Sequence, residues 1–242
     1  MKFAIISDIH GNLEALENVL RDIEKEGAEK IHFLGDAVGY GCSPNECVKL
    51  ISEHCEIRLL GNHDYAALGL EAVENFNQMA QYSITWTQEK LTKKSSAILA
   101  DFEMEADFLD YHLVHASPGE PEQWHYILTA GQSKAHFDKF SQSVCFVGHS
   151  HIPSIFSMDS EGEIMKSSKM ELEKVADRRY IINVGSVGQP RDGDPRACYI
   201  IVDTETGKVY YRRVEYDVAA AQEKMKKANM PNFLVERIAI GH

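Results

Sequence analysis

The stretch KFAIISDIHGN, residues 2–12, decides the fold and contains the first candidate site residues. Its first half is a short continuous apolar run, which predicts a buried strand. The run ends in Asp8 and His10, although a buried carboxylate destabilises a protein unless a partner compensates its charge. A single Asp at such a place is more often a turn residue or a helix cap. We interpret Asp8 and His10 as metal ligands because similar residues follow several later segments.

The segments after residue 12 alternate between helical and strand patterns. Apolar residues at helical spacing predict helices over 13–25 and 44–53, and KIHFLG (30–35) and EIRLLG (56–61) predict strands. This order of elements is typical of parallel strands joined by right-handed crossovers. The sequence pattern therefore predicts an α/β fold.

The rest of the chain changes this rhythm. Residues 65–105 are polar and helical in pattern, and we interpret them as a candidate lid. Strand patterns return in five segments: YHLVHASP, SVCFVGHSHIP, RRYIINVGS, ACYIIVDT and KVYYRRVEY. Short turns such as TETGK (204–208) predict antiparallel pairing of the last three strands, and residues 217–228 predict a closing helix. Because no proline-rich linker or repeat divides the chain, we expect residues 1–242 to form a single domain.

Charge and cysteine content argue against several classes of function. The chain has 25 Lys and Arg against 37 Asp and Glu, a formal net charge of −12, which disfavours a nucleic-acid polymer or an anionic membrane as partner. The five cysteines include no CxxC pair, so we expect reduced, mostly buried thiols. Neither a signal-peptide pattern nor an apolar stretch of membrane-spanning length is found, which predicts a cytoplasmic protein. The sequence does not determine the oligomeric state.

Polar side chains follow the predicted strands at the point where each strand ends. In an open parallel sheet these ends form one edge, and ligands bind in the crevice beside it. The sequence therefore predicts that carboxylate, imidazole and carboxamide groups meet at this edge. The candidates are Asp8, His10, Asp36, Asn62, His63, Asp64, His115, His149 and His151.

The spacing and chemistry of these residues favour metal binding. Asp8 and His10 are two residues apart, so on an extended backbone their side chains point the same way and can share an ion. His149 and His151 have the same relation. Nitrogen and oxygen ligands without thiolate suit a divalent ion such as Mn²⁺, Fe²⁺ or Zn²⁺. The seven candidate ligands, which are the residues named above without His63 and Asp64, exceed what one tetrahedral ion needs, and this favours two ions bridged by a carboxylate.

Five blocks of the sequence together resemble the calcineurin-like metallophosphoesterases. In the order of that family they are SDIHGN, GDAVGYG, GNHD, VHASP and GHSHIP, between residues 7 and 153. NVGSVGQPRDGDP (183–195) resembles a bacterial branch of phosphoesterases that includes diadenosine-tetraphosphatase-like proteins. The resemblance implies a four-layer α/β/β/α sandwich of two mixed β-sheets flanked by helices, with a dinuclear metal centre at the strand ends.

The resemblance also assigns the ligands. It implies two divalent ions (Mn, Fe, Zn, Ni or Co), of which one is held by Asp8, His10, Asp36 and His151 and the other by Asp36, Asn62, His115 and His149. This assignment divides His149 and His151 between two ions, where spacing alone lets them share one. Ions about 3.5 to 4 Å apart can each receive one of the two side chains.

The chemistry expected of such a centre is hydrolysis of a phosphomonoester or phosphodiester. A hydroxide bridging two divalent ions exists near neutral pH and can attack phosphorus in line, without a phosphoenzyme. The resemblance makes His63 the candidate for protonating the leaving oxygen or steadying the phosphoryl group. Asp64 would orient His63 or hold the loop by a hydrogen bond.

Weaker signals concern substrate binding. Asn62 and Arg191 are candidate contacts of a substrate phosphate, since guanidinium matches phosphate geometry; the alternative for Arg191 is a surface ion pair with the neighbouring Asp192 or Asp194. Tyr40 would line the pocket or pack its loop. Trp124 and Tyr126 are placed to stack on a base or to belong to the core.

Two other functions fit the same blocks. One is a non-catalytic metal-binding scaffold of this fold that acts in protein interactions, and the other is a protein serine/threonine phosphatase. We expect a small phosphoester or nucleotide substrate, because the candidate lid disfavours the open groove that a protein substrate needs. The remaining histidines are interpreted as surface or ordinary core residues: His32, His54, His112, His125, His136 and His242.

Overall fold

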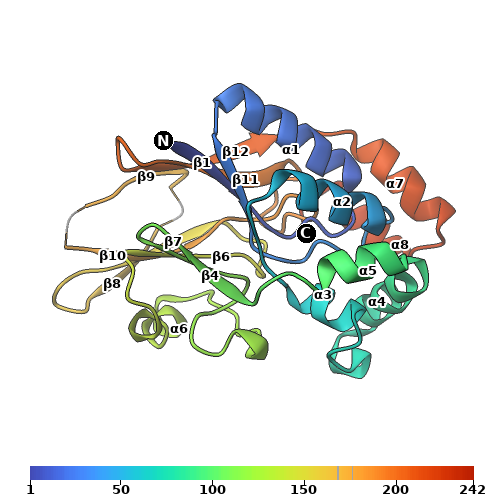
Figure 1. Ribbon diagram of the computed structural model, residues 1–242, viewed down its shortest axis with the longest axis horizontal. Coiled ribbons are helices and arrows are strands. Elements are labelled where there is room, and N and C mark those ends of the chain that lie inside the picture. Colours follow the sequence, from blue (N-terminus) through green and yellow to red (C-terminus); the bar gives the residue numbers. More distant parts are fainter. Residues whose placement is uncertain (168, 176) are drawn as a thin grey trace.

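Two six-stranded sheets form the centre of the protein (Figure 1). The computed structural model describes residues 1–167, 169–175 and 177–242. The first sheet contains, in spatial order, β3 (Ile57–Arg58), β2 (Lys30–Phe33), β1 (Lys2–Ile6), β11 (Ala197–Asp203), β12 (Lys208–Val214) and β9 (Glu171–Glu173). The predicted parallel pairing of β1, β2 and β3 is confirmed.

The second sheet is also mixed. Its spatial order is β4 (Glu105–Phe108), β5 (Tyr111–Val114), β6 (Val144–Val147), β10 (Arg179–Asn183), β7 (Ser154–Met158) and β8 (Ile164–Ser167). β5, β6 and β10 run parallel, and the outer strands are antiparallel to their neighbours. The carboxyl ends of β1, β2, β5 and β6 therefore carry the loops in which the candidate ligands lie.

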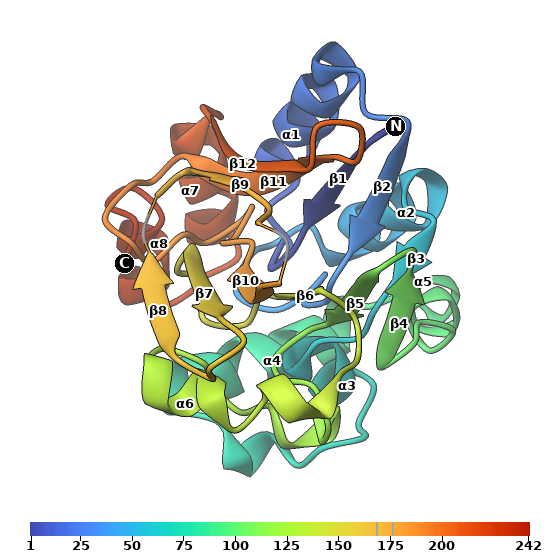
Figure 2. The ribbon, with the colours of Figure 1, turned by 90° about the vertical axis from the view of Figure 1, so that its left-hand side faces the viewer.

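Helices flank both sheets (Figure 2), and several of them gather at one end of the sheets, at the right of Figure 1. They are α1 (Leu13–Glu26), α2 (Pro44–His54), α3 (Asn62–Ala67), α4 (Gln78–Lys90), α5 (Lys93–Leu99), α6 (Ala130–Lys134), α7 (Val218–Lys227) and α8 (Asn232–Arg237), with short 3₁₀ turns at Val73–Asn75, Pro121–Gln123 and Phe137–Lys139. One apolar core lies between the sheets, a second between the first sheet and α1 and α2, and a third beneath Phe137 and Phe140. The predicted four-layer arrangement is confirmed.

Helix α1 shows why the first crossover forms where the sequence predicts it. Asn12 caps the helix by accepting a hydrogen bond from the Ala15 N–H at 3.2 Å. Leu16 and Val19 are buried on the face that packs on the sheet. Gly27 ends the helix with φ of 71°, a left-handed conformation that glycine adopts without steric cost. The observed bounds lie within one residue of the predicted helix.

The predicted antiparallel pairing of the last three strands is wrong for β10. Only β11 and β12 form the antiparallel hairpin, whereas β10 lies in the second sheet, parallel to β6 and antiparallel to β7. Two features explain the difference. Four of its five residues are buried, as in a central strand with both faces covered, and residues 184–196 form a long connection rather than a tight turn.

The segment 65–105 is largely helical, as its pattern indicates. It contains the end of α3, the turn at Val73–Asn75, α4 and α5, at the lower right of Figure 1. Apolar residues of α4 pack with those of α7 and α8 in a further core cluster. Movement of this segment as a lid stays a prediction.

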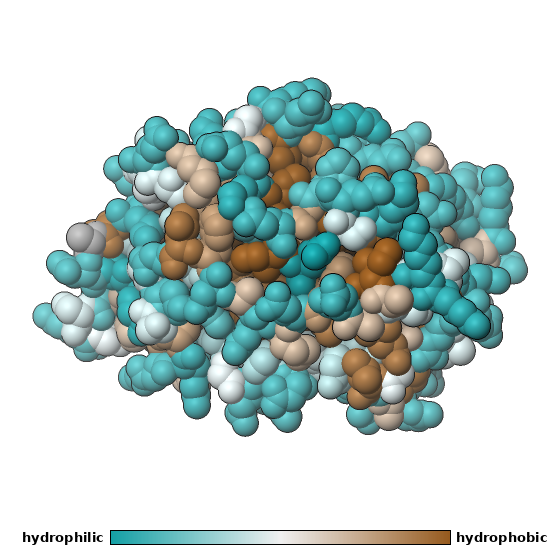
Figure 3. Space-filling view, in the orientation of Figure 1, coloured by the Kyte–Doolittle hydropathy of each residue, from teal (hydrophilic) through white to brown (hydrophobic). Residues whose placement is uncertain are grey.

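The surface and the cysteines agree with the composition. The face shown in Figure 3 is largely hydrophilic, with apolar residues gathered near its middle. All five cysteines are free thiols, and four of them are buried, as expected. Within the described ranges, we find no helix with the length and apolar character needed to cross a membrane.

His32 is a buried histidine without a polar partner, and it makes stability depend on pH. Its ring packs between Phe3 and Phe108, and neither ring nitrogen has a hydrogen-bond partner among the described residues. Burial lowers the pKa of His32 from 6.5 to about 4, so the folded protein keeps the ring neutral. Between these two pH values only the unfolded chain binds a proton at His32, and folding stability falls as pH falls.

We expect His32→Leu to remove this part of the pH dependence. The pKa difference corresponds to a loss of about 3 kcal/mol of unfolding free energy once the pH is below both pKa values, of which about 2 kcal/mol falls between about pH 7 and about pH 4.5. Urea unfolding of both proteins at about pH 7 and about pH 4.5 measures it, because each protein serves as its own reference for all other titrating groups. An equal loss of stability on acidification in both proteins would contradict the prediction.

Candidate metal centre

The loops after β1 and β2 are joined backbone to backbone, which brings the first three candidates together. The Asp8 N–H donates to the Gly35 carbonyl and the His10 N–H donates to the Asp36 carbonyl, both at 2.9 Å. Asp8, His10 and Asp36 are each 1% exposed or less. The sequence therefore folds so that two carboxylates and an imidazole are buried side by side.

Left-handed backbone conformations direct most of these side chains inward. The sequence pattern predicts an extended backbone at four of the ligands, and this prediction is wrong. The φ angles are 54° at Asp8, 49° at His10, 63° at His149 and 60° at His151. Asp36 is also left-handed, with φ of 60°. Each such residue costs roughly 1 to 3 kcal/mol, and strain of this kind concentrates at functional sites. The loops turn sharply at the strand ends and aim successive ligands at a common centre.

Two glycines leave the space that this approach requires. A Cβ added to Gly61 would collide with the Asp36 side chain, and one added to Gly148 would lie 2.6 Å from Asp8 Oδ2. Side chains at these positions would push the carboxylates out of place. The glycines of GNHD and GHSH thus permit the close contact between loops and carboxylates.

The candidate ligand atoms form two groups that share one residue. In each group the ligand atoms lie within 4.8 Å of one another. The first group is Asp8, His10, Asp36 and His151, and the second is Asp36, His115 and His149. Asp36 Oδ2 lies 3.5 Å from His10 Nε2 and 3.4 Å from His115 Nε2, between the two groups. This oxygen is in the position of a bridging ligand.

Each carboxylate uses one oxygen to hold the structure and turns the other to the centre. Asp8 Oδ2 accepts from the His149 N–H at 3.1 Å, whereas Oδ1 faces His151 Nε2 at 3.3 Å. Asp36 Oδ1 accepts from the His63 N–H at 2.8 Å and leaves Oδ2 for the centre. The fixed oxygens orient the free ones, which is how surrounding hydrogen bonds prepare a metal ligand.

Three of the histidines are held in the tautomer that metal binding needs. Their Nδ1 atoms donate to backbone carbonyls, so their Nε2 atoms carry no proton in the neutral ring. The three bonds run from His10 to Val38, from His115 to Leu34 and from His151 to Gln189, at 3.0, 3.1 and 2.7 Å. Nothing in the sequence marks these carbonyl partners, since any residue can supply a backbone oxygen.

The donor set fits two divalent cations. Four buried atoms around the centre have no hydrogen-bond partner among the described residues: Asp8 Oδ1, Asn62 Oδ1, His115 Nε2 and His149 Nε2. In addition, His10 Nε2 and His151 Nε2 lie 3.1 Å apart, a repulsive pair of lone pairs unless a cation or a proton lies between them. Two carboxylates, four imidazoles and an amide carry a charge of about −2, which two divalent ions more than neutralise.

The charges of the protein itself also favour a cation at the centre. Burial lowers the pKa values of His10, His149 and His151, so these rings are neutral. For His115 burial also opposes protonation, but the Asp36 and Asp8 carboxylates raise its pKa to about 9. The carboxylates therefore attract a positive charge into the centre, and a metal ion would replace that proton.

His63 lies beside the centre with an unused nitrogen. Its Nδ1 is buried without a hydrogen-bond partner among the described residues, and its ring is 4.9 Å from that of His10. Burial lowers the pKa of His63 to about 4. The ring also contacts Tyr40 and Phe76, at centroid distances of 4.5 and 5.5 Å, which fix its position.

The Asp64 carboxylate is bonded to the backbone of the loops and not to the His63 ring. Its carboxylate accepts four backbone N–H groups, from Gly61, Asp36, Ala37 and Val38, at 2.7 to 3.2 Å. Among the described residues no hydrogen bond joins it to the His63 ring. Burial and the Asp36 carboxylate raise the pKa of Asp64, while the backbone donors lower it. Of the two roles inferred from the sequence, these contacts favour the loop-holding one.

Tyr40 and Arg191 lie next to each other at the edge of the centre. The Tyr40 ring packs 4.7 Å from the His10 ring, and the Arg191 guanidinium lies 5.8 Å from the Tyr40 centroid. Arg191 donates to Gln189 Oε1 at 2.9 Å. The ion pair expected as its alternative is not found, because Asp192 and Asp194 pair with other arginines.

The segment around residues 120–128 covers the second ligand group. The Tyr126 ring stacks on His149 at a centroid distance of 4.1 Å, and Trp124 lies 6.0 Å from His115. Trp124 also donates to Glu71 Oε2 at 3.1 Å, which ties this segment to the helical region 65–105. The sequence singled out both aromatic residues, but their contact with ligand histidines depends on the tertiary fold.

The fold and the ligand cluster define a metallophosphoesterase. The sequence profile of the calcineurin-like phosphoesterase superfamily domain matches residues 1–207, and the chain belongs to this family, whose members typically bind two divalent metal ions. A protein of Methanocaldococcus jannaschii is 41% identical over 244 aligned positions, covering 98% of this chain and 97% of the relative.

Two solved structures share the whole fold. The crystal structure of a metallophosphoesterase from Sphaerobacter thermophilus superposes with a TM-score of 0.87 at 38% identity, covering 100% of this chain and 99% of the other. A protein of Pyrococcus horikoshii has a TM-score of 0.79 at 20% identity over 100% and 98% of the two chains. Family membership implies a hydrolase of phosphoesters, as the resemblance of the five blocks predicted.

Proposed function

We propose that this protein is a dinuclear metal-dependent phosphoesterase that hydrolyses a small phosphomonoester or phosphodiester. The observation that supports this most strongly is the position of Asp36 Oδ2 between two groups of buried candidate ligand atoms. Asp8, His10 and His151 would complete one site, and Asn62, His115 and His149 the other. When bound, two divalent ions supply Lewis-acid stabilisation of phosphate oxygens and a nucleophile formed from water at neutral pH.

The residues of the chain then have separate tasks. His63, with its free Nδ1, contacts the leaving oxygen or the phosphoryl group. Asn62 and Arg191 bind phosphate oxygens, and Tyr40 keeps His63 and Arg191 in place through ring contacts. Asp64 keeps the two loops that carry Asp36 and His63 in register through its four backbone contacts.

The covering segments favour a small substrate over a protein. Trp124 and Tyr126 lie over the second ligand group, and the helical region 65–105 is tied to them through Glu71. A phosphorylated protein chain would need this side to be open. We propose that residues 65–105 act as a lid within a single domain spanning 1–242, in a cytoplasmic protein.

Removal of metal is expected to abolish hydrolysis. The unsubstituted protein should hydrolyse nitrophenyl phosphate with added Mn²⁺, lose that activity after treatment with a chelator, and regain it when Mn²⁺ is restored. Hydrolysis is followed by absorbance and metal content by elemental analysis of the same samples. Full turnover by protein that contains no metal would refute a metal-dependent mechanism.

The same measurements separate the enzyme from a scaffold of this fold. A scaffold binds metal without turnover, whereas all seven candidate ligands and His63 are present in this chain. Retention of two ions together with absence of hydrolysis across a monoester, a diester and a dinucleoside polyphosphate would favour the scaffold.

A further inference from the structure

Gln189 is buried between the metal centre and Arg191. It belongs to the long connection after β10 and is 1% exposed. Its carbonyl oxygen accepts from His151 Nδ1 at 2.7 Å, and its N–H donates to Ser186 Oγ at 2.8 Å. The Ser186 hydroxyl in turn donates to the Asp8 carbonyl at 2.9 Å. The backbone of Gln189 is therefore fixed on both sides to residues that hold or carry candidate metal ligands.

The side chain of Gln189 reaches Arg191 with its oxygen atom. Gln189 Oε1 accepts a hydrogen bond from Arg191 Nη2 at 2.9 Å. Because a guanidinium only donates hydrogen bonds, this contact determines which end of the amide faces Arg191. The Nε2 group points away and is buried without a hydrogen-bond partner among the described residues. The Gln189 amide is thus arranged for its contact with Arg191 and not for full pairing of its own donors.

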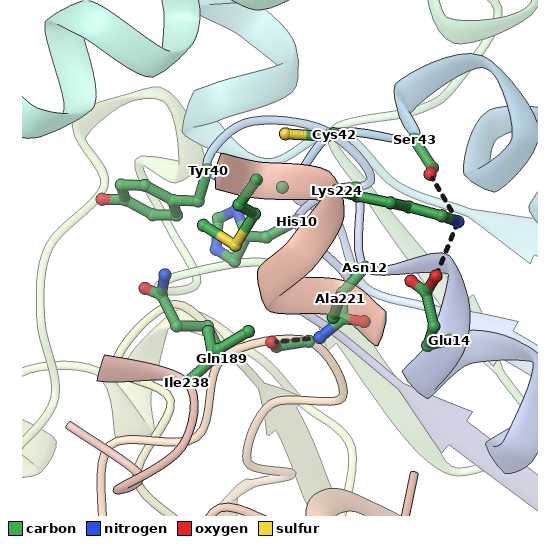
Figure 4. Close-up of a pocket in the computed structure, with 14 residues that line it drawn as sticks. His10, Asn12, Glu14, Tyr40, Cys42, Ser43, Gln189, Ala221, Lys224 and Ile238 are labelled. Carbon is green, nitrogen blue, oxygen red and sulfur yellow. Dashed lines mark hydrogen bonds and ion pairs between the residues drawn. The ribbon is translucent and has the colours of Figure 1, made fainter. Parts of the chain in front are cut away.

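The surroundings of the Gln189 amide restrict its movement. Figure 4 shows the amide below Tyr40 and His10, and all three side chains line one small cavity. The cavity has a volume of about 10 Å³, which leaves room for about one water molecule and for no substrate. The amide therefore has little free space in which to turn away from Arg191.

Arg191 is held by a neutral group, although acidic residues are close to it in the sequence. Among the ion pairs of the described residues, none includes Arg191. Asp192 pairs with Arg213 instead. Asp194 pairs with Arg196 at 2.6 Å. The contact with the Gln189 carbonyl oxygen thus orients the Arg191 guanidinium without cancelling its charge.

This charge lies at the edge of the metal centre. The Arg191 N–H donates to the His151 carbonyl at 3.2 Å, and its guanidinium lies 5.8 Å from the centroid of the Tyr40 ring. Burial lowers the pKa of His151, and the positive charge of Arg191 lowers it further. An anionic group bound at the centre would be attracted by the same charge.

We infer that Gln189 is a positioning residue for substrate binding: it fixes the Arg191 guanidinium at the edge of the metal centre and, being neutral, leaves the positive charge to the phosphate group of the substrate. A carboxylate in its place would also accept the hydrogen bond, but it would compete with the phosphate for the guanidinium. An apolar side chain would leave the charge without its orientation. This inference rests on the proposed function, in which Arg191 binds phosphate oxygens.

The test measures binding of propylphosphonate, which resembles a phosphomonoester but is not hydrolysed. Calorimetry with the Mn²⁺-loaded full chain gives its affinity for each variant. Gln189→Glu should weaken binding by roughly tenfold or more, the scale of one hydrogen bond to a charged group, and Gln189→Met by about threefold to tenfold. With nitrophenyl phosphate as substrate, the loss should appear as a higher KM with little change in kcat, because Arg191 holds the phosphate both before and during the reaction.

A double-mutant comparison shows whether Gln189 acts through Arg191. In an Arg191→Met background, Gln189→Met should weaken propylphosphonate binding no further, because no guanidinium remains to be oriented. If Gln189 only supported the backbone around His151, the loss would be the same in both backgrounds. That result, or unchanged or tighter binding of propylphosphonate by Gln189→Glu, would overturn the inference.

The control variant makes the same exchange of amide for carboxylate elsewhere. Gln132→Glu lies at an exposed position on α6 and keeps a side chain that can cap this helix, so propylphosphonate binding should not change. Metal content and thermal unfolding are recorded for every variant, and affinities are compared between samples that hold two ions. If Gln189→Glu does not fold, the uncharged Gln189→Met in the two backgrounds decides the question alone.

The outcome is separable from that of the proposed function. Hydrolysis of nitrophenyl phosphate together with unchanged propylphosphonate binding in the Gln189 variants would refute only the role of Gln189. Absence of hydrolysis of any phosphoester would refute the proposed function, while the calorimetric affinities would still decide whether Gln189 positions Arg191 for an anion.

Discussion

Asp36→Asn is expected to reduce phosphoester hydrolysis by roughly 10³-fold, because metal ions contribute several kcal/mol of transition-state stabilisation and each 1.36 kcal/mol is tenfold in rate. Asp36 Oδ2 is the only carboxylate oxygen within both groups of candidate ligands in the described part of the chain. The carboxamide keeps the size of the side chain and an oxygen for the His63 N–H, but it removes the negative charge between the two sites.

Metal content decides whether the loss has this cause. Elemental analysis should find fewer than two ions in each Asp36→Asn chain under conditions in which the unsubstituted protein holds two. Asp138→Asn, at an exposed position in the 3₁₀ turn Phe137–Lys139 outside the proposed lid, is the matched control and should change neither metal content nor turnover. Two bound ions and normal turnover in Asp36→Asn would show that Asp36 is not a bridging ligand.

The positions of the candidate ligands were predictable because their chemistry is local. A carboxylate or imidazole directly after a buried apolar run is unusual, and the strand ends of a parallel sheet meet at one edge. The short segments around Asp36 and His115 are enough to place these two residues at this edge of the sheet. The glycines of GNHD and GHSH also carry a local signal, since their lack of a side chain permits the loops to approach.

The remaining features depend on contacts between distant segments. The carbonyl oxygens that orient the histidines belong to residues such as Val38 and Gln189, whose side chains do not encode that role. Strand β10 was assigned to the wrong neighbours because a buried apolar run does not specify its partner.

The left-handed residues illustrate a limit of pattern reasoning. Spacing of two on an extended strand places Asp8 and His10 on the same side, and the two side chains do meet. They meet for another reason, because both residues have positive φ in a turn that the rest of the fold stabilises. Local strain of this kind opposes ordinary backbone preference, so a preference-based prediction does not find it.

His63→Ala is expected to reduce turnover by roughly 10² to 10⁴-fold, the usual contribution of a positioned acid or base, while both ions remain bound. The ring is held against His10 and Tyr40 and its Nδ1 lacks a hydrogen-bond partner among the described residues, so it is free to contact the substrate. His54→Ala, at an exposed position on α2, is the matched control and should leave turnover unchanged.

The leaving group distinguishes the two roles considered for His63. If the ring protonates the leaving oxygen, His63→Ala should reduce turnover far more for an alkyl phosphate than for nitrophenyl phosphate, whose leaving group needs little protonation. If it steadies the phosphoryl group, the two substrates should lose turnover equally. Turnover is measured at saturating substrate alongside metal content and thermal unfolding. Near-normal turnover on both substrates in a folded, metal-loaded variant would exclude His63 from the reaction.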